Sequence, residues 1–323
     1  MKTASKSSGH VPGSYVKRVY LSLGLLPFVL VALIIVMGIL NPRFLTPSNG
    51  IIVARQACFL ALVACGQMLV ILTRGVDVSL GAMIGLCSVL AAMVAKEFGP
   101  VAGWFTPIIV GAAVGLLNGT VVAYARIDSF AVTLGTLSIT HGLALIISKG
   151  LTIYYLPAGY KTIAYARVLT IPLPVIITFL VIVAMYVLLY RLRFGRYVYA
   201  AGDNIEALRR SGVNTSRVLL LVFCGAGILT GISATLLSSR INSGQPNLGG
   251  APLMLESIAA CVIGGVTFQG GVGTLLGVIF GILFLSAMSN GFDIIGVSAF
   301  AKQVVVGSII IIAVVVDKYK ERG

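Results

Sequence analysis

Asp77 is the first candidate for chemistry, because it is a carboxylate that interrupts apolar sequence. It lies in residues 73–81, TRGVDVSLG, which insert charge and glycine between two apolar stretches with almost no loop. A carboxylate at membrane depth is costly unless it caps a helix, pairs with another group or faces water. A helix is predicted to begin near Val78, and the charge of Asp77 suits its positive end. We therefore expect a helix cap, with contact to a passing solute as the alternative.

Other polar residues also lie in apolar surroundings. Asn118 interrupts an apolar stretch, and its amide needs partners there, so bonding between helices is favoured over lining a pathway. Glu256 lies near the predicted start of another helix, where it either caps that helix or faces a pathway. An ion-coupled carrier would use Asp77, Glu256 or Asp293 as its coupling carboxylate. The candidates for a helix cap or a pathway are Asp77, Ser79, Asn118 and Glu256.

A polar, arginine-rich loop covers about residues 191–216. Asp203 or Asn204 can cap a short helix there that ends at Gly212 and presents Arg209 and Arg210. A motor domain of a partner protein would bind such a helix if the helix were exposed beside the membrane. On periodicity alone, a helix lying on the lipid surface is an equal alternative. The residues assigned to the motor contact are Gly202, Asn204, Ala207, Arg209, Arg210, Ser211 and Gly212.

The chain has no recognisable motif for ATP hydrolysis or for intramembrane hydrolysis. The patterns GxxxxGK[ST], HExxH and GxSxG are all absent. Five cysteines lie in apolar stretches without CxxC spacing, and His141 is the only histidine inside a predicted span. We expect reduced, packed cysteines, a satisfied buried imidazole, no metal site and no cofactor bound by this chain. The protein is predicted not to be an enzyme, so transport must draw its energy from a partner or an ion gradient.

Long apolar stretches must position these residues. Hydrophobic residues make up 58% of the 323 residues and charged residues 10%. The apolar stretches have the length that a membrane helix needs, so we expect an all-α protein with about ten transmembrane helices. The first is too long for a secretory signal and has no cleavage site. The predicted spans are 21–40, 51–72, 78–95, 101–123, 130–147, 171–190, 217–237, 254–268, 272–289 and 300–316.

The basic residues predict the orientation and the domain organisation. They are concentrated in the tails and the even-numbered loops, which places both termini and the 191–216 loop in the cytoplasm. Lys149, Lys161 and Arg167 stand against this pattern in one outer segment. The predicted parts are cytoplasmic tails at 1–18 and 318–323 and a membrane domain at 19–317. The net charge of +14 is dispersed along membrane flanks, so lipid contact is favoured over nucleic-acid binding.

Glycines recur four residues apart in several predicted spans. Such rows let helix backbones approach closely, which drives helix association in lipid. We expect plain helix packing, with sliding contacts during transport as the alternative. The glycines assigned to helix packing are Gly81, Gly85, Gly111, Gly115, Gly273 and Gly277.

Taken together, these motifs resemble one family. Residues 75–81, GVDVSLG, are similar to the G-[IV]-D-L-S-V-G signature of membrane subunits of bacterial ABC importers for ribose, xylose, galactose and related monosaccharides. The resemblance covers about residues 20–316. It departs from the family at the start of the eighth span, where the family often has a Glu-Leu-Asp run and this chain has Met254, Leu255 and Glu256. Further matching segments are 115–119, 129–136, 202–212, 258–265 and 270–274.

The resemblance implies a type II-like helical bundle in the bacterial inner membrane. Two copies of the chain, or the chain and a close paralogue, would form the pathway between them. ATP-binding subunits carrying ATP and magnesium would dock on the 202–212 loop, and a periplasmic binding protein would deliver the sugar. Alternating access would then move the sugar into the cytoplasm.

Two other kinds of transporter remain as alternatives. Importers for branched-chain amino acids share the helical architecture. An ion-coupled carrier would need no ATPase, but the chain lacks an inverted repeat of comparable halves and has the arginine-rich loop.

Overall fold

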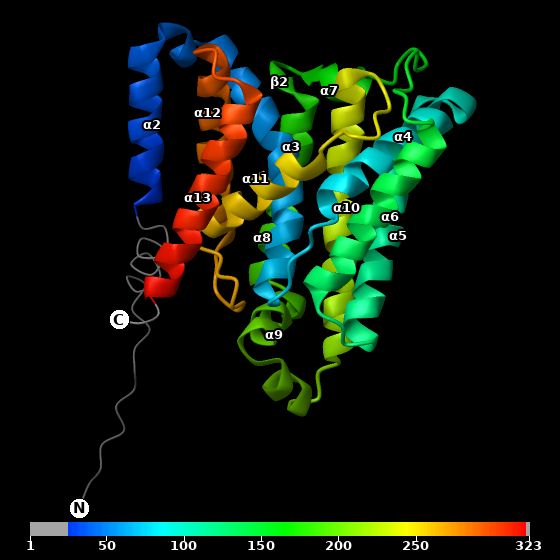
Figure 1. Cartoon of the computed structure of the whole chain (residues 1–323), viewed down its shortest axis with the longest axis vertical. Coiled ribbons are helices and arrows are strands. Elements are labelled where there is room, and N and C mark those ends of the chain that lie inside the picture. The colour runs from blue at the N-terminus through cyan, green and yellow to red at the C-terminus, as the bar shows by residue number, and fades with distance from the viewer. Residues whose placement is uncertain (1–24, 321–323) are drawn as a thin grey trace, which may run out of the picture.

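The computed structural model describes residues 25–320 as a bundle of mostly upright helices (Figure 1). The expected tail at 1–18 and the start of the first expected span lie outside these residues. The last helix continues to Lys320, three residues into the expected C-terminal tail. The elements up to the first outer segment are α2 (Leu26–Leu40), η1 (Pro42–Leu45), α3 (Pro47–Leu72), α4 (Leu80–Phe98), α5 (Pro100–Tyr124) and α6 (Ser129–Ser148). The remaining elements are α7 (Thr162–Tyr165), β1 (Arg167–Val168), β2 (Ile171–Pro172), α8 (Leu173–Tyr190), α9 (Arg193–Arg210), α10 (Thr215–Ile241), α11 (Gly250–Ile263), α12 (Leu275–Ile294) and α13 (Ala299–Lys320).

The lengths of these helices confirm a polytopic, all-α membrane architecture. Within the described residues, seven helices are long and apolar enough to cross a membrane, and three shorter apolar stretches lie in α2, α11 and α13. Together they correspond to the ten apolar segments expected. The prediction of a full span at 254–268 is wrong, since α11 has 14 residues and is about 21 Å long. The hydrocarbon core of a bilayer is about 30 Å thick.

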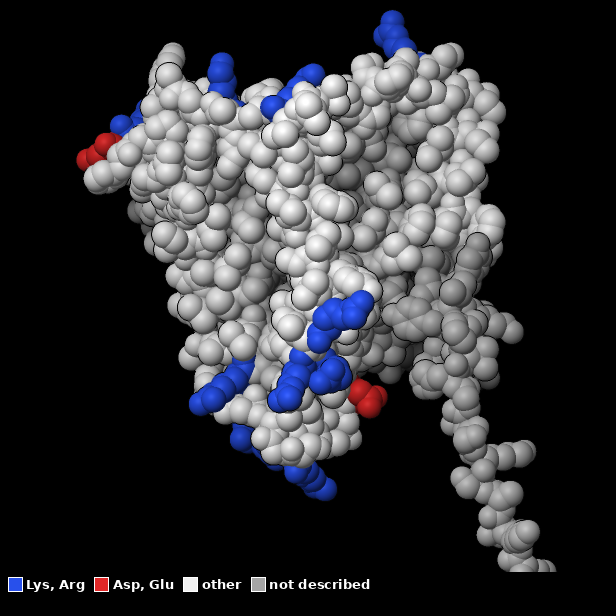
Figure 2. Space-filling view, turned by 180° about the vertical axis from the view of Figure 1, so that it is seen from behind, with Lys and Arg blue, Asp and Glu red and all other residues white. Residues whose placement is uncertain are grey.

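The charged side chains lie at the two ends of the bundle. Figure 2 shows Lys and Arg at the top and bottom of one face and a nearly uncharged band between them. Such a band is what lipid tails require, because a charged side chain at bilayer depth is costly. We call the end where α9 lies the α9 end; it is at the bottom of Figure 1.

Two extended segments enter the bundle from opposite ends. Residues 73–79 leave the α9 end after α3, and residues 242–249 leave the opposite end after α10 (Figure 1). Each leads to a helix, α4 or α11, that begins inside the molecule. A backbone without helical bonds is tolerated at this depth only where protein or water satisfies it. Helix α3 lies at the centre, and its residues from Ala57 to Leu72 are all buried.

Close backbone contacts confirm the packing role of several glycines. A Cβ on Gly111 would lie 2.2 Å from the Gly227 carbonyl oxygen, and one on Gly115 would lie 2.3 Å from the Phe223 oxygen, so α5 and α10 touch. A Cβ on Gly277 would lie 2.0 Å from the Gly264 oxygen at the end of α11. These distances are too short for any side chain, which is why glycine is needed there.

Three of the assigned glycines act differently from the expectation. A Cβ on Gly81 would meet the carbonyl oxygen of Gly250, and one on Gly85 would meet that of Pro246, each at 2.1 Å. They therefore seat the 242–250 region rather than a neighbouring long helix. Gly273 is not in a helix, since α12 begins at Leu275. Its backbone has a φ of +148°, which serves the turn before that helix.

Candidate functional site

Asp77 stands at the centre of a buried polar network. Its side chain is fully buried, and Oδ1 accepts hydrogen bonds from the Ser79 amide at 2.9 Å and the Ser79 hydroxyl at 2.6 Å. Helix α4 begins at Leu80, two residues after the predicted start near Val78, and its N-cap residue is Ser79. Asp77 therefore fixes the turn before the helix instead of occupying the cap position itself. Its second carboxylate oxygen, Oδ2, has no hydrogen-bond partner among the described residues.

Asn118 extends this network across two more helices. Its Nδ2 donates to the Ser79 hydroxyl oxygen at 3.1 Å, and its Oδ1 accepts from the Thr136 hydroxyl at 2.6 Å. Asn118 and Thr136 lie on α5 and α6 and are buried. Bonding between helices, the favoured interpretation of Asn118, is thus confirmed. An unpaired amide in this position would be costly, so the chain gives its polar atoms partners.

Hydroxyl groups of α6 satisfy the backbone of the 73–79 segment. The Val76 amide donates to Ser129 Oγ at 3.0 Å, and the Val78 amide donates to Thr133 Oγ1 at 3.2 Å. Thr133 also donates to the Val76 carbonyl oxygen at 3.2 Å. These bonds replace the helical bonds that an extended segment lacks. The 73–79 segment is therefore held in one position by α6.

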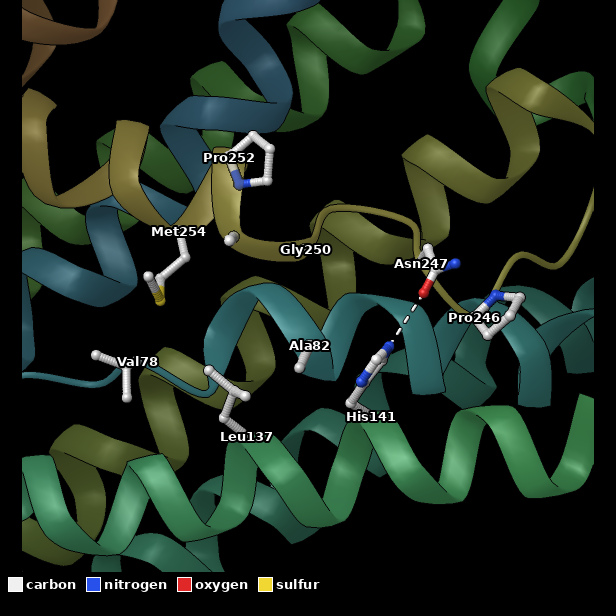
Figure 3. Close-up of a pocket in the computed structure, with 10 residues that line it drawn as sticks. Val78, Ala82, Leu137, His141, Pro246, Asn247, Gly250, Pro252 and Met254 are labelled. Atoms are coloured by element: carbon white, nitrogen blue, oxygen red, sulfur yellow. Dashed lines mark hydrogen bonds between the residues drawn. The ribbon is translucent and has the colours of Figure 1, made fainter. Parts of the chain in front are cut away.

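A cavity of about 390 Å³ opens where the two extended segments meet (Figure 3). It is bounded by the end of the 73–79 segment, by α4 and α6, and by the 242–249 segment with the start of α11. Among residues 25–320, no Asp, Glu, Lys or Arg lines it. The lining residues are Val78, Ala82, Leu137, His141, Pro246, Asn247, Gly250, Ala251, Pro252 and Met254.

His141 and Asn247 are the polar side chains of this cavity. The His141 Nε2 and Asn247 Oδ1 atoms lie 3.0 Å apart, and Figure 3 shows the bond crossing from α6 to the 242–249 segment. His141 is half-buried rather than fully buried, so the expectation of a buried imidazole is wrong, although its ring is hydrogen-bonded. Asn247 was missed because it follows a proline in a stretch that reads as an ordinary loop. Its neighbours Pro246 and Gly249 were the available signal.

Glu256 does not cap its helix. It lies in the middle of α11, whose N-cap residue is Gly249. It borders a second, smaller cavity of about 210 Å³ between α11 and α13, together with Lys302 and Gln303. Lys302 forms an ion pair with Asp293 at the end of α12. Pro252 borders both cavities, so Glu256 lies close to the first cavity but outside its lining.

Helix α9 carries the exposed surface of the arginine-rich loop. Its backbone breaks at Asn204, where φ is −154° and ψ is 97°, and a short helix follows. Asn204 Oδ1 accepts a hydrogen bond from the Ala207 amide at 2.9 Å, so the predicted cap is confirmed for Asn204. The backbone turns at Gly212, where φ is +83°. Arg209 pairs with Glu206 at 2.5 Å.

The residues assigned to the motor contact do not share one surface. Six of them are exposed on or just after the short helix, namely Asn204, Ala207, Arg209, Arg210, Ser211 and Gly212. Gly202 is buried and faces inward, where its Cα approaches the Leu72 carbonyl oxygen of α3. A Cβ there would lie 1.9 Å from that oxygen. Gly202 therefore belongs to the packing of α9 against the bundle and not to its outer surface.

The five cysteines are unpaired, and four of them are buried, as expected for packing residues. Within the described part of the chain, no three His, Cys, Asp or Glu side chains are close enough together to hold a metal ion.

Comparison with known proteins identifies the relatives of this chain. Residues 50–314 match the family described as the permease component of the branched-chain amino acid transport system. The ribose import permease protein RbsC of Bacillus subtilis (strain 168) is 38% identical over 298 residues, which are 91% of this chain and 92% of the relative. The D-allose transport system permease protein AlsC of Escherichia coli (strain K12) is 32% identical, covering 90% of each chain.

A third relative is named for a different substrate. The autoinducer 2 import system permease protein LsrC of Yersinia pseudotuberculosis serotype O:3 (strain YPIII) is 33% identical, covering 89% of this chain and 82% of the relative. No solved structure matches this chain.

Proposed function

The chain belongs to the family of branched-chain amino acid transport system permease components, and from that premise we propose that it imports a monosaccharide as the permease subunit of an ATP-driven transporter. The observation that carries the sugar assignment is its similarity, over nearly its full length, to permeases named for ribose and allose. Because another relative is named for autoinducer 2, the proposal also includes related small polar solutes.

The chemistry of the cavity favours a neutral polyol over an amino acid. A zwitterionic amino acid would need a cation for its carboxylate and an anion for its ammonium group, and the cavity lining holds no Asp, Glu, Lys or Arg. His141 and Asn247 can instead exchange hydrogen bonds with hydroxyl groups. Weak contacts also suit a route that must release its cargo. An importer for branched-chain amino acids is the second candidate, since the family description names it.

The contacts of Asp77 and Asp293 weigh against an ion-coupled carrier. One oxygen of Asp77 is occupied by two hydrogen bonds from Ser79, and Asp293 is paired with Lys302. Glu256 borders a separate cavity rather than the one between the extended segments. These carboxylates therefore do not gather around one cation site.

ATP hydrolysis would be supplied by separate subunits that grip the short helix after Asn204. This helix is the exposed end of α9, and Arg210 on it has no ion-pair partner among the described residues. Its charge is therefore available to an acidic cleft. We expect Arg210→Glu to leave the protein inserted in the membrane and to abolish copurification of the ATPase. Normal copurification would contradict this role.

The α9 end would face the cytoplasm. Its basic residues include Arg126 between α5 and α6 and the arginines of α9, in agreement with the excess of Lys and Arg in cytoplasmic loops. The chain is a multi-pass membrane protein of a bacterial importer family, and the inner membrane is its proposed location. A second copy, or a paralogue, would complete the pathway, and a periplasmic binding protein would deliver the sugar.

Uptake by reconstituted vesicles tests the proposal. Labelled ribose, allose, xylose, galactose and leucine would be offered to vesicles that contain this chain, with and without its ATPase, binding protein and internal ATP. We expect uptake of one sugar that requires all three additions. Uptake of leucine would favour the amino-acid importer, and uptake by this chain alone under an ion gradient would establish a carrier.

A further inference from the structure

Arg74 joins three segments that are far apart in the sequence. Its Nε donates to the Gln269 carbonyl oxygen at 2.6 Å, and its Nη2 donates to the Asp203 carbonyl oxygen at 2.7 Å. Arg74 itself lies two residues after the end of α3, near the start of the 73–79 segment. The exposed Arg74 side chain therefore connects the start of the 73–79 segment to α9 and to the loop between α11 and α12.

The backbone of Arg74 is unusual for the residue it carries. Its φ is +64°, a left-handed conformation that brings the Cβ close to the following carbonyl oxygen. Glycine is the common residue where a helix ends in this way, because it has no Cβ. The Arg74 amide still donates to the Ile71 oxygen at 2.9 Å, as any residue there could. The side chain is thus used for its guanidinium group, not to shape the turn.

Backbone contacts join the same three segments beneath Arg74. The Gly271 amide donates to the Leu72 carbonyl oxygen at 2.9 Å, which bonds the α11–α12 loop to the end of α3. Gly202 of α9 lies directly on this pair, since a Cβ would be 1.9 Å from the Leu72 oxygen and 2.3 Å from the Gly271 nitrogen. The Tyr199 hydroxyl donates to the Gly273 carbonyl oxygen at 2.9 Å. Helix α9 therefore packs closely against the loop, and Arg74 adds side-chain hydrogen bonds to both.

Both bonded segments lead directly to the walls of the cavity. Val78, which lines the cavity, follows Arg74 in the extended segment. The loop that holds Gln269 follows α11, whose first turn lines the same cavity through Gly250 and Ala251. A displacement of α9 that Arg74 transmits would reach Val78 through a short extended stretch, and it would reach Gly250 and Ala251 through the length of α11, which acts as a rigid rod.

We propose that Arg74 is a positioning residue that makes the two walls of the cavity follow α9, so that ATPase movement on the short helix changes access to the cavity. The inference rests on the proposed function and adds to it the residue that transmits the motion. The Gln269 and Asp203 carbonyl oxygens need a forked donor, and the guanidinium group supplies one.

Arg74→Gly separates this role from a role in stability. Glycine adopts the left-handed backbone freely and keeps the amide bond to Ile71, so the variant should melt no lower than the parent chain. In the complete importer we expect ATPase copurification to persist and sugar uptake per ATP hydrolysed to fall at least tenfold. In Arg74→Lys, which keeps the charge but lacks the forked pair of donors, sugar uptake per ATP hydrolysed should also fall severalfold.

Arg126→Gly is the matched control. Arg126 also has a positive φ, of +55°, lies at the same end of the molecule, and makes no side-chain hydrogen bond among the described residues. Its uptake per ATP should equal that of the parent. Normal uptake in Arg74→Gly, a lower melting temperature, or loss of ATPase binding would each overturn the inference. A parent importer that assembles but takes up no sugar would instead reject the proposed function.

Discussion

The two extended segments reach the same cavity but are held by different means. The 73–79 segment is nearly all buried, and side chains of α5 and α6 satisfy its polar groups through Asn118, Ser129 and Thr133. The 242–249 segment is held near its start by backbone hydrogen bonds between Gly244 and Ile153 and by the Gln245 amide, which donates to Ser88 Oγ at 3.0 Å. Its end, with the first residue of α11, rests on two glycines of α4, which approach the Pro246 and Gly250 carbonyl oxygens. Its one bond across the cavity, from Asn247 to His141, is exposed.

This difference separates a segment that can move only together with α5 and α6 from one whose end, from Pro246 onward, can move alone. Moving the first segment would leave several buried donors and acceptors unpaired, which is costly. The end of the second segment, from Pro246 onward, can leave its position by losing van der Waals contact and one exposed hydrogen bond, while Gly244 and Gln245 stay bonded to Ile153 and Ser88. The comparison therefore predicts that substitutions in the polar network and in the glycine seat have different consequences for folding and for transport.

Gly85→Ala should have the largest effect on stability. The added Cβ would lie 2.1 Å from the Pro246 carbonyl oxygen, and neither backbone can move without disturbing α4 or the segment. We expect a loss of about 3 kcal/mol in the free energy of unfolding in detergent. Gly135→Ala on α6 is the matched control, since a Cβ there meets nothing within 4 Å. Equal stability of the two variants would show that the contact between Gly85 and the Pro246 carbonyl oxygen is not tight.

Asn118→Ala should destabilise the protein somewhat less. It leaves the buried Thr136 and Ser79 hydroxyls without their shared partner, at a cost of about 2 kcal/mol. Thr120→Ala is the control on the same helix, because Thr120 is exposed and bonds only within α5, to the Leu116 oxygen. Denaturation of both variants in detergent would measure the difference. A result of the same size for both would mean that the buried network does not hold the segment.

Asp77→Asn should have a small effect. The amide oxygen can accept both Ser79 hydrogen bonds, so we expect a stability change below about 1 kcal/mol and retention of most of the uptake. Asp77→Leu removes the acceptor oxygen, so this variant should lose both stability and uptake. A folded Asp77→Asn variant without transport would instead assign the negative charge a direct role in the pathway.

Asn247→Ala should change stability least. The bond that it removes is exposed, so the free energy of unfolding should change by less than about 0.5 kcal/mol. If His141 and Asn247 bind sugar hydroxyls, the apparent affinity for the sugar in uptake should nevertheless fall. The control is Ser138→Ala, because Ser138 is exposed on α6 and its substitution leaves the cavity unchanged. Asn214→Ala is unsuitable as a control because Asn214 caps α10. Unchanged sugar affinity in Asn247→Ala would remove this residue from the route.

The sequence predicted the helices better than the segments between them. Hydropathy locates α3, α5 and α10 because lipid imposes length and apolarity on a spanning helix. It could not show that the region near Glu256 forms a short helix starting inside the bundle, since an apolar stretch reads the same in either arrangement. The cap at Asn204 was predictable because it depends on neighbours in the chain.

Contacts between distant segments were beyond a single sequence. Gly202 reads as part of an exposed loop, and its inward position depends on Leu72 and Gly271. Gly81 and Gly85 have the spacing of helix-packing residues, yet the carbonyl oxygens that they meet belong to Gly250, the first residue of α11, and to Pro246 in the segment before it. The partners of Asn118 were likewise open until α5 and α6 were placed. Spacing predicts which face a residue occupies, but only the fold supplies what lies against that face.

Labelling of a cysteine in the cavity tests most directly whether the sugar passes between the two segments. Ala82→Cys lines the cavity, and Met93→Cys lies on the exposed surface of the same helix. Both would be treated with a water-soluble thiol reagent in the reconstituted importer during ATP hydrolysis, with the parent chain as background. We expect labelled Ala82→Cys to lose uptake and labelled Met93→Cys to keep it. Failure of Ala82→Cys to react, or full uptake after labelling, would contradict a route through this cavity.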